Sequence, residues 1–134
     1  RRALEVYTRE KHPTEWALTQ WSLGDALLAL GRRERDVGAF REAVVAYRRA
    51  LEVFTREKYP VIWAEAQELL GQALLAIAKL NQDKQAAREA LKAFDLAAEG
   101  YKTAGFAKQL ADIESLREEA RAIIEGGSGG KGEK

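Results

Sequence analysis

The chain has 134 residues, which is enough for one domain or a short run of repeats but not for two independent globular cores. Apolar residues make up 46% and charged residues 32%, a balance typical of a folded protein. The formal net charge of +1 excludes the basic excess expected of a dedicated nucleic-acid-binding domain. With no cysteine and one histidine, the chain lacks the residues of thiol catalysis and of common metal sites. We therefore expect no cofactor, no metal and no enzymatic activity.

Membrane insertion is not expected either. The longest strongly apolar run covers residues 73–78, far fewer than the roughly 20 residues that span a bilayer. We expect a soluble, cytoplasmic protein whose partners include neither membranes nor nucleic acids.

A repeat with a period of 47 residues organises the chain. The segment 3–13, ALEVYTREKHP, returns at 50–60 as ALEVFTREKYP, and the same offset places Trp16 on Trp63. Self-similarity over this length predicts structurally equivalent units that stack on one another. The similarity fades toward the C-terminus, as is common for a terminal repeat that caps a stack.

Residues 1–11 are predicted to form a partial helix. They align with residues 48–58, so the segment begins halfway along a helix whose first half and hairpin partner are absent. Together with the missing initial Met, this leads us to expect a truncated or engineered chain. Self-association is then expected through the uncovered apolar side chains of Leu4 and Tyr7.

Residues 14–58 are predicted to form a first helical hairpin. Its first helix carries a stripe with steps of three and four residues: Trp16, Gln20, Leu23, Leu27 and Leu30. Its second helix carries another: Phe40, Val44, Tyr47, Leu51 and Phe54. The polar segment from Gly31 to Gly38 is predicted to be the turn, with Asp36 near the start of the second helix.

Residues 61–104 are predicted to repeat this hairpin. Pro13 and Pro60 precede the two hairpins, at helix starts where the missing N–H of proline breaks no hydrogen bond. A terminal helix is expected over residues 107–125. The Gly-rich segment 126–134 is expected to be a flexible tail.

One short motif occurs in both hairpins. A Leu-Gly pair is followed three residues later by a large apolar residue, and the second helix then carries small, aromatic and small residues. The matching residues are Leu23, Gly24, Leu27, Ala43, Tyr47 and Ala50, and then Leu70, Gly71, Leu74, Ala90, Phe94 and Ala97. In this motif the chain resembles the tetratricopeptide repeat (TPR) family. The usual TPR period is 34 residues, so the resemblance is to a long-period, bacterial-type form of the family.

The resemblance implies an all-α, right-handed stack of antiparallel helix hairpins, a TPR-like α-solenoid, over residues 1–125. It also implies a protein–protein interaction module that binds a peptide or protein segment in a concave groove. The groove positions that it implies are Leu18, Trp21, Asp25, Leu28, Glu65, Glu68, Gln72, Leu75, Asp112, Ser115 and Glu119. Because the charged members are all acidic, we expect an acidic groove and a basic partner. Without Lys or Arg there, a clamp for a C-terminal carboxylate is not expected.

Trp21 is singled out because it breaks the repeat. It aligns with Glu68, so we expect its site to be open to solvent and its ring to anchor a ligand; the alternative is packing on a neighbouring helix. A second hypothesis for the whole chain is a structural or engineered repeat scaffold without a ligand, which self-associates as a homo-oligomer through its exposed helical ends.

Overall fold

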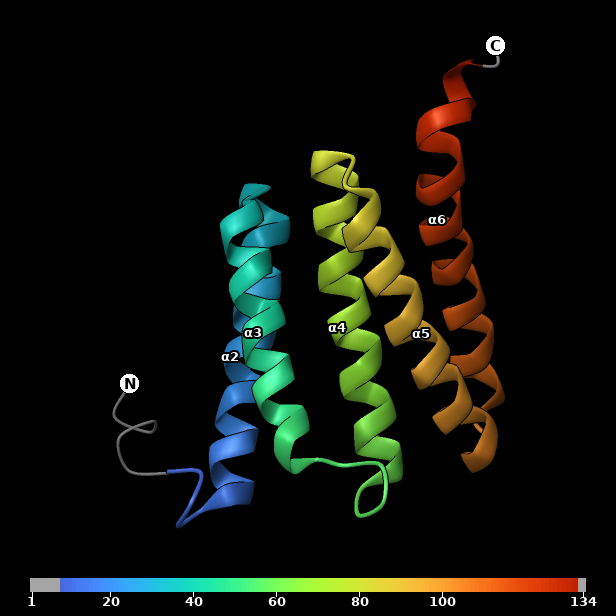
Figure 1. Cartoon of the computed structure of the whole chain (residues 1–134). Coiled ribbons are helices and arrows are strands. Elements are labelled where there is room, and N and C mark those ends of the chain that lie inside the picture. Colours follow the sequence, from blue (N-terminus) through green and yellow to red (C-terminus); the bar gives the residue numbers. More distant parts are fainter. Residues whose placement is uncertain (1–7, 133–134) are drawn as a thin grey trace.

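A computed structural model describes residues 8–132 and contains helices and no strands in this range, so the expected all-α class is confirmed (Figure 1). The helices are α2 (Pro13–Glu34), α3 (Val37–Val53), α4 (Pro60–Asn81), α5 (Lys84–Ala104) and α6 (Ala107–Gly132). Leu4 and Tyr7, proposed for self-association, lie outside the described residues. Of the partial helix expected over residues 1–11, the part from 8 to 11 is a turn.

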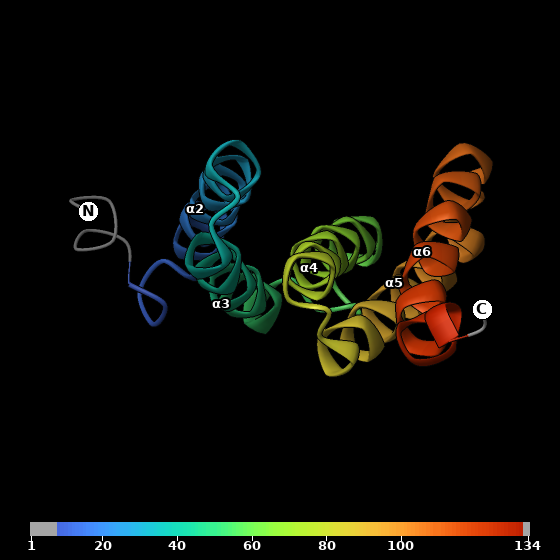
Figure 2. The ribbon, with the colours of Figure 1, turned by 90° about the horizontal axis from the view of Figure 1, so that it is seen from above.

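The helices form two layers. Seen from above, α2, α4 and α6 lie in one layer, and α3 and α5 in the other (Figure 2). Helix α2 packs on α3 and α4 packs on α5, while α3 also contacts α4, and α6 contacts both α5 and α4. The core is continuous through this arrangement, because buried residues from all five helices belong to one cluster.

Both hairpin links are two residues long and have the same construction. Helices α2 and α4 end at Glu34 and Asn81, and each is followed by a residue with a positive φ of 53°, Arg35 or Gln82. The next residue is Asp36 or Asp83, and its carboxylate accepts a hydrogen bond from the backbone N–H three residues later, at 3.3 Å and 3.1 Å. The left-handed residue reverses the chain and the aspartate caps the next helix, so each link needs no more residues.

The link between α2 and α3 is therefore shorter than the predicted turn from Gly31 to Gly38. Gly31 lies within α2, where a Cβ atom would come within 2.6 Å of the Phe40 ring. Its role is close packing of the two helices and not chain reversal. Gly24 and Gly71 lie in the same way against Tyr47 and Phe94.

Helix α6 continues to Gly132, past the boundary expected at residue 125. The segment after 125 contains glycines but no proline, so its backbone can keep helical geometry, although each glycine weakens the helix.

Helix α4 is long and apolar enough to cross a membrane by length and composition, with a mean hydropathy of 1.2. Half of that stretch is buried in the fold, a combination typical of a core helix.

Candidate peptide-binding groove

Helices α2, α4 and α6 together line one surface hollow. Its volume is about 210 Å³, and its lining residues are Arg32, Gln72, Leu75, Ala76, Lys79, Leu116 and Glu119. The hollow joins three helices that are far apart in sequence and lie in one layer of the fold (Figure 2). We call the face that α2, α4 and α6 form around this hollow the groove.

A chain of hydrogen bonds crosses the groove. A guanidinium N–H of Arg32 on α2 donates to the amide oxygen of Gln72 on α4 at 2.7 Å. The amide nitrogen of Gln72 donates to Glu68 at 3.4 Å, and the hydroxyl of Tyr101 on α5 donates to the other oxygen of Glu68 at 2.8 Å. These contacts fix the orientation of the polar side chains before any partner binds.

Negative charge is concentrated beside this chain of hydrogen bonds. Burial raises the pKa of Glu65, and the nearby carboxylate of Glu68 raises it further. Burial also raises the pKa of Tyr101 above its usual range, and its hydrogen bond to Glu68 acts in the same direction. A cation placed next to Glu65 and Glu68 would relieve the repulsion between them.

Asp25 contributes a further carboxylate from α2. Its side chain is exposed and accepts a hydrogen bond from the buried hydroxyl of Tyr47 at 2.6 Å. Burial raises the pKa of Tyr47, and the hydrogen bond to Asp25 raises it further. Asp25 is thus held by the α2–α3 hairpin and still presents its carboxylate to solvent.

The groove also contains two cations that the sequence-based set omitted. Arg32 binds Gln72, and Lys79 forms an ion pair with Glu119 of α6. The groove is therefore acidic near Asp25, Glu65 and Glu68 but of mixed charge around the hollow. Arg32 and Lys79 each follow the predicted groove positions of their helix by one further turn, so a longer stripe would have found them.

The sequence predicts that Trp21 is open to solvent, and this prediction is wrong. Its side chain is half-buried, and its ring meets the ring of Phe54 edge to face with centroids 6.0 Å apart. The indole also packs against both buried apolar clusters, the main core and a smaller cluster formed by Ala17, Ala50 and Phe54. Leu28, another predicted contact residue, is only 4% exposed and belongs to the core. Leu18 is 52% exposed and remains accessible.

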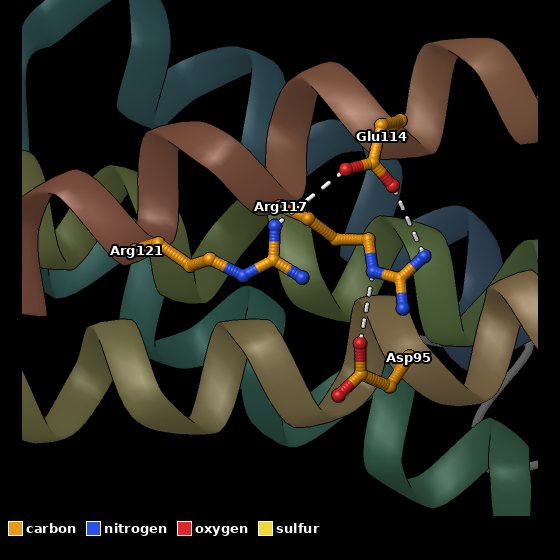
Figure 3. Close-up of polar contacts among 4 residues, drawn as sticks. All are labelled: Asp95, Glu114, Arg117 and Arg121. Carbon is orange, nitrogen blue, oxygen red and sulfur yellow. Dashed lines mark hydrogen bonds and ion pairs between the residues drawn. The ribbon is translucent and has the colours of Figure 1, made fainter.

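The third wall is α6, which a polar cluster joins to α5 (Figure 3). Arg117 donates to Asp95 of α5 at 2.9 Å and to Glu114 of α6 at 3.2 Å, and Arg121 also pairs with Glu114. The side chain of Arg117 is only 26% exposed, so this cluster is partly shielded from water. The periodic stripes gave no signal of it.

The remaining predicted positions on α6 are on the surface. Asp112 and Ser115 are exposed, and Asp112 forms an ion pair with Lys108 at 3.7 Å. Among the described residues, no group of three or more His, Cys, Asp or Glu side chains is placed to hold a metal ion.

Comparison of the chain with family models, with curated proteins and with solved structures gives no match.

Proposed function

We propose that this protein is a protein–protein interaction module, a TPR-like right-handed stack of helix hairpins that binds a peptide or protein segment along the groove. The observation that supports this most is the hollow that α2, α4 and α6 share. Leu75 and Leu116 give it an apolar floor, and charged side chains surround it. A pocket with this pattern suits an apolar anchor residue flanked by polar contacts.

The charges favour a basic partner with an apolar residue. Asp25 and Glu65 are exposed, and the Glu65 carboxylate already experiences the repulsion of Glu68. A Lys or Arg of the partner near these carboxylates gains an ion pair and relieves that repulsion. An adjacent apolar side chain then enters the hollow. Because Asp25, Glu68 and Gln72 are held by hydrogen bonds within the protein, these side chains lose little entropy on binding.

A peptide array tests this proposal. The array pairs basic sequences that contain one large apolar residue with acidic and alanine-substituted counterparts, and it is probed with the labelled protein. We expect retention by the basic, apolar-containing peptides and weaker retention in added salt, because exposed charges are screened. Preference for the acidic counterparts, or no retention by any peptide, contradicts the proposal.

A matched pair of charge reversals locates the site. Glu65→Lys places a cation in the groove, whereas Glu42→Lys makes the same change at an exposed position of α3 in the other layer. We expect Glu65→Lys to weaken binding of the best array peptide by about tenfold or more, and Glu42→Lys to change it by less than about twofold. Equal effects of the two variants contradict binding in the groove.

A further inference from the structure

One side of α2 carries an apolar stripe that no other helix covers among the described residues. Helix α2 stands at one end of the array, and it meets α3 through Ala17, Gly24 and neighbouring buried residues (Figure 2). Beside that contact, four apolar side chains are partly or fully exposed: Trp16, Leu23, Leu27 and Leu30, of which Trp16 and Leu27 also pack against buried apolar clusters. We call these four residues the α2 stripe. Leu23 is its most exposed member, at 37%.

The same positions of the second hairpin are buried. The residues 47 positions later are Trp63, Leu70, Leu74 and Ile77, and none is more than 9% exposed. Helix α3 packs on α4 and lies beside this set, since Val44 of α3 lines one hollow together with Leu74 and Ile77. The repeat therefore uses this face for contact with another helix.

The local structure at the start of the α2 stripe also follows the repeat. The Arg9 guanidinium lies over the Trp16 ring at 5.9 Å, and Arg56 lies over Trp63 at 5.0 Å. The backbone turns before α2 and α4 have the same hydrogen bond, from the N–H of His12 and of Tyr59 to the carbonyl four residues earlier. The difference between the two faces is thus one of coverage and not of local conformation.

The opposite end of the array cannot supply the cover. The face of α6 that corresponds in the repeat to the α3-facing side of α2 contains Glu114, Glu118 and Glu125, which are all exposed. An acidic helix face does not suit an apolar stripe, because carboxylates buried against apolar side chains lose their hydration. Head-to-tail stacking of two copies through α6 and α2 is therefore disfavoured.

The α2 stripe is instead suited to pairing with itself. Leu23 lies midway between Trp16 and Leu30, seven residues from each. Seven residues are close to two helical turns, so the three residues lie in one row. If two copies of α2 pack antiparallel across a two-fold axis at Leu23, Trp16 of each copy meets Leu30 of the other. Asp25 is directed to Tyr47 and not into this row, and the Arg9 guanidinium lies over the Trp16 ring at the end of the row.

We propose that two copies of this protein form a homodimer through their α2 stripes, packed antiparallel about a two-fold axis at Leu23. One helix row buries less surface than the roughly 1,600 Å² of a standard interface, so the dimer is expected to dissociate in the micromolar range. This surface is separate from the groove, which holds the opposite flank of α2.

Sedimentation velocity at about 5 to 500 µM protein tests the dimer, a range chosen for a weak interface. We expect a concentration-dependent shift from monomer to dimer for the unaltered protein. Leu23→Glu should weaken dimerisation by about tenfold or more, because it buries a carboxylate on the axis. Val45→Glu is the control, since Val45 is 46% exposed on α3. A protein that stays monomeric throughout, or a Leu23→Glu variant that dimerises like the control, overturns the proposal.

Single-cysteine variants test the symmetry. The chain has no cysteine, so Leu23→Cys introduces one thiol per protomer, at the axis of the dimer. Under mild oxidation we expect Leu23→Cys to give a disulfide-linked dimer and Val45→Cys to remain monomeric. Equal cross-linking of the two variants overturns the two-fold arrangement.

A shortened chain tests whether residues 1–7 of the same chain, and not a second copy, cover the α2 stripe. A shortened chain that begins at Thr8 is compared with the full chain by sedimentation. We expect both to dimerise. If only the shortened chain dimerises, residues 1–7 cover the α2 stripe and the proposal is overturned. The peptide array reports on the groove independently, so either proposal can fail without the other.

Discussion

The hydroxyl of Tyr47 donates a 2.6 Å hydrogen bond to Asp25, and the second hairpin replaces both residues together. At the equivalent positions stand Phe94 and Gln72. Phenylalanine has no hydroxyl group, so no acceptor is needed, and Gln72 instead joins α4 to Arg32 of α2. The buried hydroxyl of Tyr47 needs an acceptor, which explains why α2 carries a carboxylate at Asp25. The same hydrogen bond determines where this carboxylate lies in the groove.

The buried tyrosines predict a loss of stability at alkaline pH. Burial, with the carboxylate partners, raises the pKa of Tyr47 and of Tyr101 in the folded protein. In the unfolded chain both titrate near pH 10. Their contribution to stability is therefore fully present below about pH 10 and is lost as the pH rises toward the folded-state pKa.

Urea denaturation between about pH 8 and pH 11.5, the interval around the unfolded tyrosine pKa, checks this prediction. The Tyr47→Phe, Tyr101→Phe double variant should be less stable at pH 8, by about 1 kcal/mol for each lost hydrogen bond. Its free energy of unfolding should then fall less steeply with pH than that of the unaltered protein. Parallel curves for the double variant and the unaltered protein contradict the assignment.

Two glycine-to-alanine substitutions should have opposite effects. A Cβ atom on Gly71 would come within 2.5 Å of the Phe94 ring, which is completely buried and has no room to move. Gly71→Ala should destabilise the protein by about 1–3 kcal/mol, although alanine favours helices. A Cβ atom on Gly126 would meet nothing within 4 Å, so Gly126→Ala should be neutral or stabilising by up to about 1 kcal/mol. Thermal and urea melts of the two variants measure both changes.

The periodic sequence was sufficient to predict the hairpins, but it was ambiguous about single residues. Glycine occurs both in turns and where two helices pack closely. Only the position of the Phe40 ring shows that Gly31 is a close-packing residue. The cations of the groove were missed for a different reason. The predicted groove set followed α2 and α4 only to Leu28 and Leu75, and Arg32 and Lys79 come one turn later. The α5–α6 polar cluster has no periodic signal, because it joins surface residues of two different helices.

Trp21 shows why a break in a repeat does not by itself indicate an exposed site. The repeat places Trp21 on Glu68 and Phe54 on Tyr101. In the first hairpin the pair is an edge-to-face ring contact at 6.0 Å, and in the second it is a hydrogen bond at 2.8 Å. The two partners changed together, so the site is a contact in both hairpins. The second hairpin accommodates Glu68 at this position because Tyr101 donates a hydrogen bond to it, and not because the position is open to solvent.

Trp21→Ala should accordingly lower stability by about 2–4 kcal/mol, because it removes a large, half-buried ring from the core. Leu18→Ala is the comparison, on the same helix and 52% exposed, and should cost less than about 1 kcal/mol. Urea denaturation gives both values. A Trp21→Ala protein as stable as the Leu18→Ala protein would restore the interpretation of Trp21 as an open ligand anchor.

Transplanting the second pair into the first hairpin tests the coupling directly. Trp21→Glu alone leaves a carboxylate beside Phe54, and Phe54→Tyr alone puts a hydroxyl where the indole offers no acceptor; each should lose about 1–3 kcal/mol. The double variant can form the hydrogen bond that Tyr101 makes to Glu68. It should therefore be more stable than the sum of the single losses predicts, by about 1–2 kcal/mol of coupling. A matched cycle that combines Trp21→Glu with Leu30→Ala, more than two helical turns away on the stripe, should show no coupling. If both cycles are additive, the pairing at these positions is coincidental, and the repeat constrains only their helical register.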